Sequence, residues 1–433
     1  MARKILILTM LLITKCVKTQ TVIYDSLDSQ IINLGRVEDN NEDFSDFDRL
    51  DSLLKGVEIV MLGEQSHGEA TTYDTKIKLI KYLHQELDFD ILAFESGFYE
   101  CNKARQMIES GESVRDALGR SVFTLWSATK DFIPLAEYVE KTKLSGSPIL
   151  LFGFDSQVTG IYSKEHYLTD LEGYLRKGTP SVLSTTDWNS FSDNMSLIFL
   201  QNYKGFKRGN PERALFFIKS TIEKIEGIEQ NSESEFWIQA LKNTYSFLSD
   251  IATKNDLRDK QMANNLIWIK EKYPNSKIIC WGATSHFLYN SDKVKMKNLI
   301  VRIIAGNYYK KHQMMGDYLK EKYQEKIFTV GFTAYQGKYG LFSSNKTIQE
   351  PKKGTLEHLL GQSQFNNFLV PFKNNDVRGY PSRPLGNYYM ANKITDVMDA
   401  VIFNRNMRRP KLDKDFFLKL YPNHRYIRPD QEE

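Results

Sequence analysis

Cysteine is scarce in this chain, which has only Cys16, Cys101 and Cys280 in 433 residues. Three cysteines are too few for a disulfide scaffold. Because no two of them form a Cys-x-x-Cys pair, the common cysteine-based zinc and redox sites are also excluded. Cys280 lies inside an apolar run and is expected to be a buried, small hydrophobic residue.

The chain also lacks an excess of charge of either sign, because 58 lysines and arginines accompany 54 aspartates and glutamates. A net charge of +4 is too small to indicate a nucleic-acid-binding surface, so we expect a small-molecule substrate. Hydrophobic residues make up 41% of the chain and charged residues 26%, ordinary values for a globular protein. A multi-span membrane protein and extensive disorder are therefore both disfavoured.

Several motifs with known chemistry are missing. The sequence has no Gly-x-Ser-x-Gly elbow, no His-Glu-x-x-His, no P-loop and no Rossmann glycine fingerprint. Serine-nucleophile, zinc-peptidase and nucleotide-binding sites of these kinds therefore lack their sequence context.

The N-terminus follows the pattern of a signal peptide. A short cationic stretch precedes an apolar run, Ile5–Ile13, which is too brief to span a bilayer. We expect residues 1–19 to be removed on export, leaving residues 20–433 as one periplasmic or extracellular domain without a membrane span. Lipoprotein anchoring at Cys16 is disfavoured because Lys15 before it is bulky and charged. A first strand or helix of the fold is the alternative interpretation.

Short apolar runs, each ending near a polar residue, recur along the chain. They are Val57–Leu62, Phe89–Phe94, Ile149–Phe154, Lys277–Trp281 and Ile327–Phe332. Such runs are typical of strands buried on both faces of a parallel sheet. Helical spacing from Tyr73 to Leu87 predicts a β-α-β unit between the first two. We predict an α/β fold with a mainly parallel central sheet flanked by helices.

Two later regions break this alternation. From about residue 162 to residue 267 the spacing is helical, which predicts a helical insertion between two halves of the sheet. After about Asn345 the chain is rich in Asn, Pro, Lys and Gly, and the apolar run Val397–Phe403 is expected to form an edge strand.

Ionisable residues stand where the predicted strands end. They are Glu64, His67, Glu95, Asp155 and His286. Ligands of open α/β sheets bind beyond the carboxyl ends of the strands, whereas core packing would exclude charge. We therefore expect these residues to share one cleft.

The densest motif is Gly63-Glu-Gln-Ser-His-Gly-Glu69, on the loop after the first strand. Its glycines allow a sharp turn that exposes the imidazole of His67. A histidine titrates near neutral pH, so His67 can take a proton from water attacking an ester carbonyl, while Glu64 or Glu95 holds the ring. A histidine that only caps the following helix is the structural alternative.

A metal site is another interpretation of these residues. Glu64, His67, Glu95 and His286 are ligand types that suit zinc or manganese. Glu-x-x-His is also the di-iron spacing, but that site needs two facing copies on helices, and this chain has one copy after a strand. Catalysis without a metal or other cofactor is the favoured hypothesis.

These motifs together resemble the erythromycin esterase family. The resemblance rests on Gly63–Gly68, Glu95 and the stretch Trp281-Gly-Ala-Thr-Ser-His286, and it spans residues 57–403. Supporting segments are Gly153–Asp155, Arg258–Met262, Met315–Gly316 and Arg383–Gly386.

The resemblance implies a hydrolase that opens ester or lactone bonds with histidine-activated water, generally without a demonstrated metal requirement. On this sequence the base is His67, with Glu64, Glu95 and His286 as the other catalytic residues.

Two departures from the family bear on the substrate. Macrolide-hydrolysing members carry Ala-His-Asn-x-His where this chain reads Gly282-Ala-Thr-Ser-His286, so only the second histidine is kept. Lys76 stands where those members carry an arginine, which keeps the charge but loses bidentate recognition. Lys76 and Asp155 are the predicted substrate-binding residues. The expected substrate is an ester or lactone that need not be a macrolide.

Two rival classes stay open. One is a non-catalytic, small-molecule-binding member of the family, in which Ala283 and Thr284 mark the loss of turnover. The other is a metal-dependent hydrolase or peptidase on a similar fold. The intact acidic and histidine residues at the strand ends argue against the first.

Overall fold

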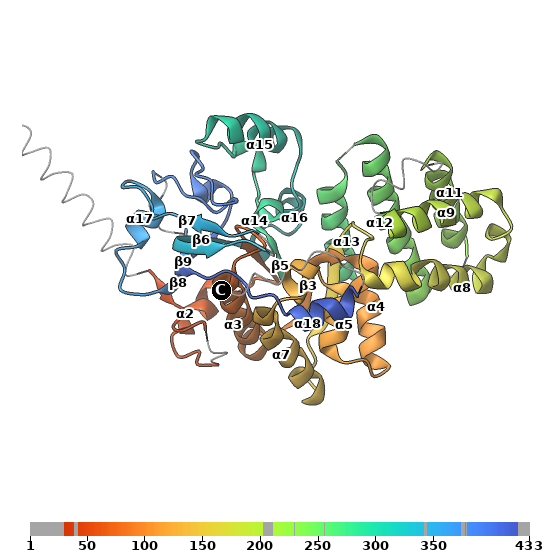
Figure 1. The fold of residues 1–433 in the computed structure, drawn as a ribbon, viewed down its shortest axis with the longest axis horizontal. Coiled ribbons are helices and arrows are strands. Elements are labelled where there is room, and N and C mark those ends of the chain that lie inside the picture. The colour runs from red at the N-terminus through yellow and green to blue at the C-terminus, as the bar shows by residue number, and fades with distance from the viewer. Residues whose placement is uncertain are drawn as a thin grey trace, which may run out of the picture.

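The computed structural model describes residues 30–38, 42–201, 211–228, 230–254, 256–341, 344–373, 377 and 379–422. The predicted signal segment, residues 1–19, and Cys16 within it lie outside these ranges. In the described part of the chain, helices surround one central sheet (Figure 1). None of the described helices is long and apolar enough to cross a membrane.

The sheet contains nine strands among the described residues. Five of them correspond to the predicted apolar runs: β2 (Ile59–Glu64), β3 (Phe89–Gly97), β4 (Leu150–Asp155), β5 (Lys277–Ala283) and β6 (Ile327–Tyr339). These five lie side by side in the order β6-β2-β5-β3-β4, and each pair is parallel. The predicted, mainly parallel sheet is confirmed.

Helices cover both faces of this sheet. They include α3 (Ala70–Leu87) and α7 (Ile133–Leu144) on one face, and α13 (Arg258–Lys272) and α16 (Met315–Tyr323) on the other. Alternate residues of β2 serve the two cores, because Val60 packs in the first and Ile59 in the second. Burial on both faces explains why these strands are almost continuously apolar.

The segment from β2 through α3 to β3 is the predicted β-α-β unit. The predicted helical positions Tyr73, Ile77, Ile80 and Leu83 are buried, and α3 ends at Asp88 with a positive φ of 57°. Strand β5 lies between β2 and β3, so the two strands are parallel members of one sheet but not neighbours. A strand that arrives almost two hundred residues later gives no local signal of this position.

The chain between β4 and β5 is helical, as predicted. Its α-helices in the described residues are α8 (Leu168–Gly178), α9 (Thr186–Gln201), α11 (Pro211–Glu226), α12 (Ser232–Thr253) and α13. Figure 1 shows the first four as a lobe beside the sheet, where α11 packs against both α9 and α12. Helix α13 instead packs on the sheet, next to β4. The end of the lobe therefore falls at α12.

The final strand, β9 (Ala400–Met407), lies inside the sheet. It pairs in parallel with β6 and antiparallel with β8 (Asn367–Pro371), and β1 (Ile32–Asn33) pairs with β8 beyond it. The prediction that Val397–Phe403 forms an edge strand is therefore wrong. Strand β8 covers the expected edge, and its five residues are too few to stand out from the polar sequence around them.

The remaining elements of the described chain are α2 (Asp48–Leu53), α4 (Phe98–Glu109), α5 (Val114–Ser121), α6 (Thr124–Ser127), α14 (Thr284–Phe287), α15 (Leu299–Lys311), β7 (Lys346–Ile348), α17 (Leu356–Leu360) and α18 (Lys414–Leu420), apart from short 3-10 and π turns. Cys101 and Cys280 are both buried and unpaired with one another.

Candidate active site

The carboxyl ends of the parallel strands place the predicted site residues along one edge of the sheet. Glu64 ends β2, Glu95 lies near the end of β3, and Asp155 ends β4. His67 follows β2 on the loop to α3, and His286 lies on α14 directly after β5. Their contacts divide them into one group around His67 and a second group around His286.

In the first group, Glu64 is a fully buried carboxylate that meets three donors. Its Oε1 lies 2.8 Å from His67 Nδ1 and accepts from Trp126 Nε1 at 2.8 Å. Its Oε2 accepts from Lys76 Nζ at 2.8 Å. Burial acts to raise the pKa of Glu64, but the Lys76 charge and the His67 hydrogen bond outweigh it, so the pKa lies below its ordinary value. Glu64 is therefore ionised at neutral pH.

The pair with Glu64 determines the orientation of His67. With Nδ1–H donating to the carboxylate, Nε2 is left as the proton acceptor, and the side chain is 31% exposed. The imidazole also packs against Phe123 and Trp126, with both ring centroids 5.4 Å away. Burial acts to lower the pKa of His67, but the hydrogen bond and charge of Glu64, helped by Glu95, raise it above the ordinary value.

Lys76 lies behind this group rather than at its surface. The side chain is fully buried, and Nζ also donates to the carbonyl oxygen of Gly282 at 3.1 Å. The ammonium lies 4.7 Å from the centre of the Trp281 ring, a favourable cation–π distance. Two of the three N–H donors of Lys76 are therefore used inside the protein, and its substrate-binding role stays a prediction. Its contacts are those of a residue that positions Glu64.

The loop that carries His67 is held by the C-terminal part of the chain. Gln65 Nε2 donates to the carbonyl oxygen of Arg383 at 2.7 Å, and the Gln65 carbonyl accepts from Gly386 N at 3.0 Å. A Cβ atom at Gly68 would lie 2.7 Å from the backbone of Gly340, so only glycine fits there. The segments Gly63–Gly68 and Arg383–Gly386, which both belong to the family resemblance, are therefore in contact.

In the second group, Arg258 at the start of α13 joins three of the strand ends. Its Nε and Nη2 donate to the two carboxylate oxygens of Asp155 at 2.9 and 2.8 Å. Nη2 also donates to Glu95 at 3.1 Å, and Nη1 lies 3.4 Å from His286 Nε2. Arg258 engages the buried carboxylate of Asp155 bidentately, and the substrate-binding role of Asp155 stays a prediction.

Acidic residues flank both ring nitrogens of His286. Nδ1 lies 2.8 Å from Asp259 Oδ1, and Nε2 lies 3.4 Å from Glu95 Oε1. Burial acts to lower the pKa of His286, but the charges of Asp259 and Glu95 raise it to about 9. His286 is therefore protonated at neutral pH and suited to stabilising negative charge.

The donor set does not fit the metal interpretation. The described residues contain no group of three or more His, Cys, Asp or Glu side chains placed to hold a metal ion. Protein cations already neutralise the carboxylates that such a site would use, because Lys76 binds Glu64 and Arg258 binds Glu95.

Sequence reasoning did not assign a role to four residues that complete the site: Phe123, Trp126, Arg258 and Asp259. Arg258 and Asp259 had a signal, because they open a helix within a segment that resembles the family. Trp126 lies on α6, a helix of four residues in the crossover between β3 and β4, and had none.

Comparison with known proteins identifies a family and individual relatives of this chain. A family model described as erythromycin esterase matches residues 84–407. YbfO of Bacillus subtilis (strain 168) is 29% identical over 353 residues, covering 74% of this chain and 75% of that protein. Erythromycin esterase type II of Escherichia coli is 22% identical over 409 residues, covering 83% of this chain and 92% of the esterase.

Solved structures share the fold. A succinoglycan biosynthesis protein aligns with a TM-score of 0.73 at 18% identity, over 91% of this chain and 99% of that chain. An erythromycin esterase mutant in its open conformation aligns with a TM-score of 0.66 at 16% identity, over 87% of this chain and 97% of that chain.

The fold and site define an α/β protein with two histidine–carboxylate pairs at the carboxyl edge of a mainly parallel sheet. The chain belongs to the erythromycin esterase family, a family of hydrolases, because the family model covers most of its length. The matched region begins after His67 and contains Glu95, Arg258 and His286. The resemblance seen in the sequence is confirmed.

Proposed function

We propose that this protein hydrolyses an ester or lactone bond with water activated by His67. The observation that carries the proposal is the 2.8 Å contact between Nδ1 of His67 and the buried carboxylate of Glu64. Among the described residues, Nε2 of the same ring makes no hydrogen bond. Water bound there gives a proton to Nε2 as its oxygen attacks the carbonyl carbon. The proton then passes to the leaving alkoxide as the carbon–oxygen bond breaks, which restores neutral His67.

His286 and Arg258 supply positive charge for the oxyanion that forms on the carbonyl oxygen. Two cationic N–H donors, Nε2 of His286 and Nη1 of Arg258, lie only 3.4 Å apart. Fixed donors of this kind stabilise an oxyanion without reorganising during the reaction. Glu95 connects the two groups, because its charge raises the pKa of both His67 and His286.

The proposed substrate is an ester or lactone that need not be a macrolide. Ala283 and Thr284 replace the first histidine and the asparagine of macrolide-hydrolysing members. Ala283 donates its backbone N–H to Glu95 at 2.7 Å, and Thr284 is buried against the Gly63 carbonyl. Neither side chain offers an imidazole to a substrate.

Export with loss of residues 1–19 is also proposed, on the N-terminal pattern alone.

Hydrolysis is expected to survive removal of metal ions, because protein cations neutralise the site carboxylates. The measurement is a screen of aryl esters, lactones and macrolides before and after dialysis against a chelator. A rate that disappears and returns only with zinc or manganese would transfer the site to the metal interpretation. Absence of turnover on every ester and lactone would contradict the proposed function.

Activity is expected to fall as the pH rises through about 9, because His286 then loses its proton. Asp259→Asn removes one of the two charges that raise this pKa, so the alkaline limb of kcat/KM should move to lower pH. The raised pKa of His286 also contributes to the free energy of unfolding. This contribution is at its full size below about pH 6.5 and is lost as the pH rises through about 9.

The control for this variant is Glu321→Gln, an exposed acid on α16. It should leave the alkaline limb in place. An Asp259→Asn enzyme whose alkaline limb coincides with that of the wild type would show that protonated His286 is not required.

A further inference from the structure

Helix α15 lies on the outside of the molecule (Figure 1), and it carries exposed apolar side chains. Leu299, Ile300 and Ile303 are 60%, 69% and 59% exposed. Residues separated by three and four positions lie on the same side of an α-helix, so these side chains form one patch. Scattered apolar side chains are ordinary on a surface, whereas a contiguous patch indicates an interaction site.

Basic residues surround this patch. The stretch from Lys293 to Lys311 contains five lysines, one arginine and no acidic residue. All six are exposed: Lys293, Lys295, Lys297, Arg302, Lys310 and Lys311. None of them makes an ion pair within the described part of the chain. The outer surface of α15 therefore combines aliphatic side chains with uncompensated positive charge.

The opposite side of α15 is already packed. Tyr309 is buried, and the ring of Tyr308 stacks on His312 with centroids 4.8 Å apart. His312 in turn pairs with Asp256 at 3.2 Å. These contacts anchor the C-terminal end of α15 on the protein. The exposed patch is therefore not the side through which the helix packs on the core.

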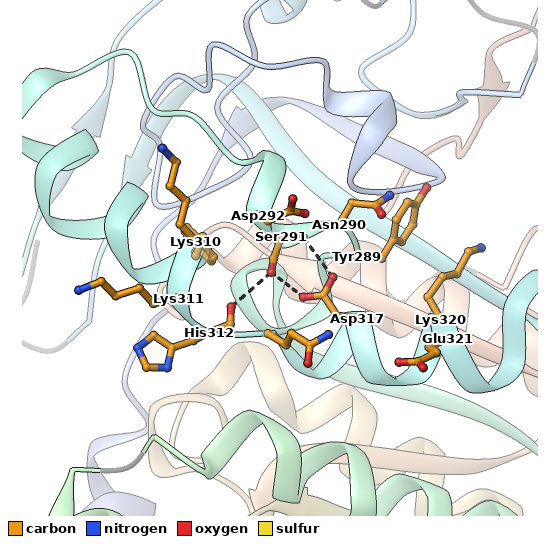
Figure 2. A pocket seen from close by; sticks show the side chains of 12 residues that line it. Tyr289, Asn290, Ser291, Asp292, Lys310, Lys311, His312, Asp317, Lys320 and Glu321 are labelled. Atoms are coloured by element: carbon orange, nitrogen blue, oxygen red, sulfur yellow. Dashed lines mark hydrogen bonds between the residues drawn. The ribbon is translucent and has the colours of Figure 1, made fainter.

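Lys310 and Lys311 also help to line a neighbouring groove of about 460 Å³, but their ammonium groups are not tied to its acids. Figure 2 shows hydrogen bonds between Ser291 and Asp317 within it, while the side chains of Lys310 and Lys311 extend away from these bonds. Their ammonium groups are available to a surface outside the molecule.

We propose that α15 docks this protein on an anionic lipid surface. The aliphatic side chains enter the boundary between headgroups and acyl chains, and the basic side chains meet lipid phosphates. Self-association through the same face is disfavoured, because the stretch from Lys293 to Lys311 would bring together six cations from each copy and carries no acid of its own.

Hydrogen exchange on the full chain tests this docking, with vesicles of phosphatidylglycerol or of phosphatidylcholine alone. Peptides covering residues 293–312 should gain protection with the anionic vesicles only, and added salt should weaken it. The peptide-level readout separates α15 from the apolar N-terminal run, which can itself bind lipid. Binding without protection of α15, or no binding, would overturn the proposal.

Variants make the test specific. Ile300→Ser with Ile303→Ser, and separately Lys310→Glu with Lys311→Glu, should each weaken binding to anionic vesicles roughly tenfold or more. The matched controls are Leu144→Ser, at a leucine that is 77% exposed, and Lys164→Glu with Lys254→Glu. These controls should bind as the wild type does.

All these variants should keep the hydrolysis rate on a soluble ester, so failure here is distinguishable from failure of the proposed function. If the isoleucine variants instead convert a dimer into a monomer and leave vesicle binding unchanged, the face joins two copies of the chain. That outcome would also overturn the proposal.

Discussion

His67→Asn is expected to lower kcat by a factor on the order of 100 to 10,000, or roughly 3 to 5 kcal/mol of barrier. Asparagine preserves part of the shape and can still donate to Glu64, but it cannot accept a proton from water near neutral pH. Steady-state kinetics on an ester that the wild type hydrolyses would measure the loss. Substrate binding and the folded structure should be nearly unchanged.

The pH profile identifies the residue that is responsible. Because the pKa of His67 lies above its ordinary value, the acidic limb of wild-type kcat/KM should lie at higher pH than an unperturbed histidine gives, with activity increasing as the proton leaves. Glu64→Gln should move that limb to lower pH and lower kcat, since the ring then loses its orienting charge. Wild-type kcat with an unchanged acidic limb in His67→Asn would make His67 structural.

His84→Asn is the matched control. This histidine lies on α3, is partly buried, and contacts the Tyr138 hydroxyl at 2.7 Å. His84→Asn makes the same substitution at a histidine outside the site, so kcat should stay at the wild-type value.

The sequence allowed prediction of the central sheet because its strands are apolar on both faces and end at charged residues. Position within the sheet was less accessible. Strand β5 enters between β2 and β3, and β8 covers β9. Both placements depend on pairing between distant segments, which leaves no mark on local composition.

The His67 group was accessible for a similar reason. Glu64 ends β2 and His67 follows only three residues later, so their contact needs no tertiary information. The second group depends on the packing of α13, which brings Arg258 to strand ends more than a hundred residues earlier in the chain and Asp259 to His286. The burial of Lys76 could not be read from charge alone, because a lysine usually lies at the surface.

Lys76→Met is expected to lower the free energy of unfolding by about 3 to 5 kcal/mol, because it removes one partner of a buried ion pair. Methionine fills much of the same volume beside Trp281, but it leaves the ionised carboxylate of Glu64 buried with only His67 and Trp126 as donors. Urea denaturation would measure the change. We also expect kcat to fall, since Glu64 would no longer be held in place.

Lys81→Met on the same helix is the control for burying a lysine. Its side chain is 2% exposed, but its partner Glu42 is 36% exposed and stays hydrated when the lysine is lost. Loss of this ion pair in Lys81→Met should lower the free energy of unfolding by about 1 kcal/mol or less. The comparison separates loss of a lysine from isolation of a buried carboxylate.

The double variant Glu64→Gln with Lys76→Met keeps the test informative if the single variant does not fold. Removing both charges leaves no unpaired ion, so the double variant should be more stable than Lys76→Met although it lacks one more native group. A double variant that is less stable by the full sum of both single losses would show that the two charges act independently. The lysine would then contribute packing alone, and Glu64 would owe its ionised state to His67 and Trp126.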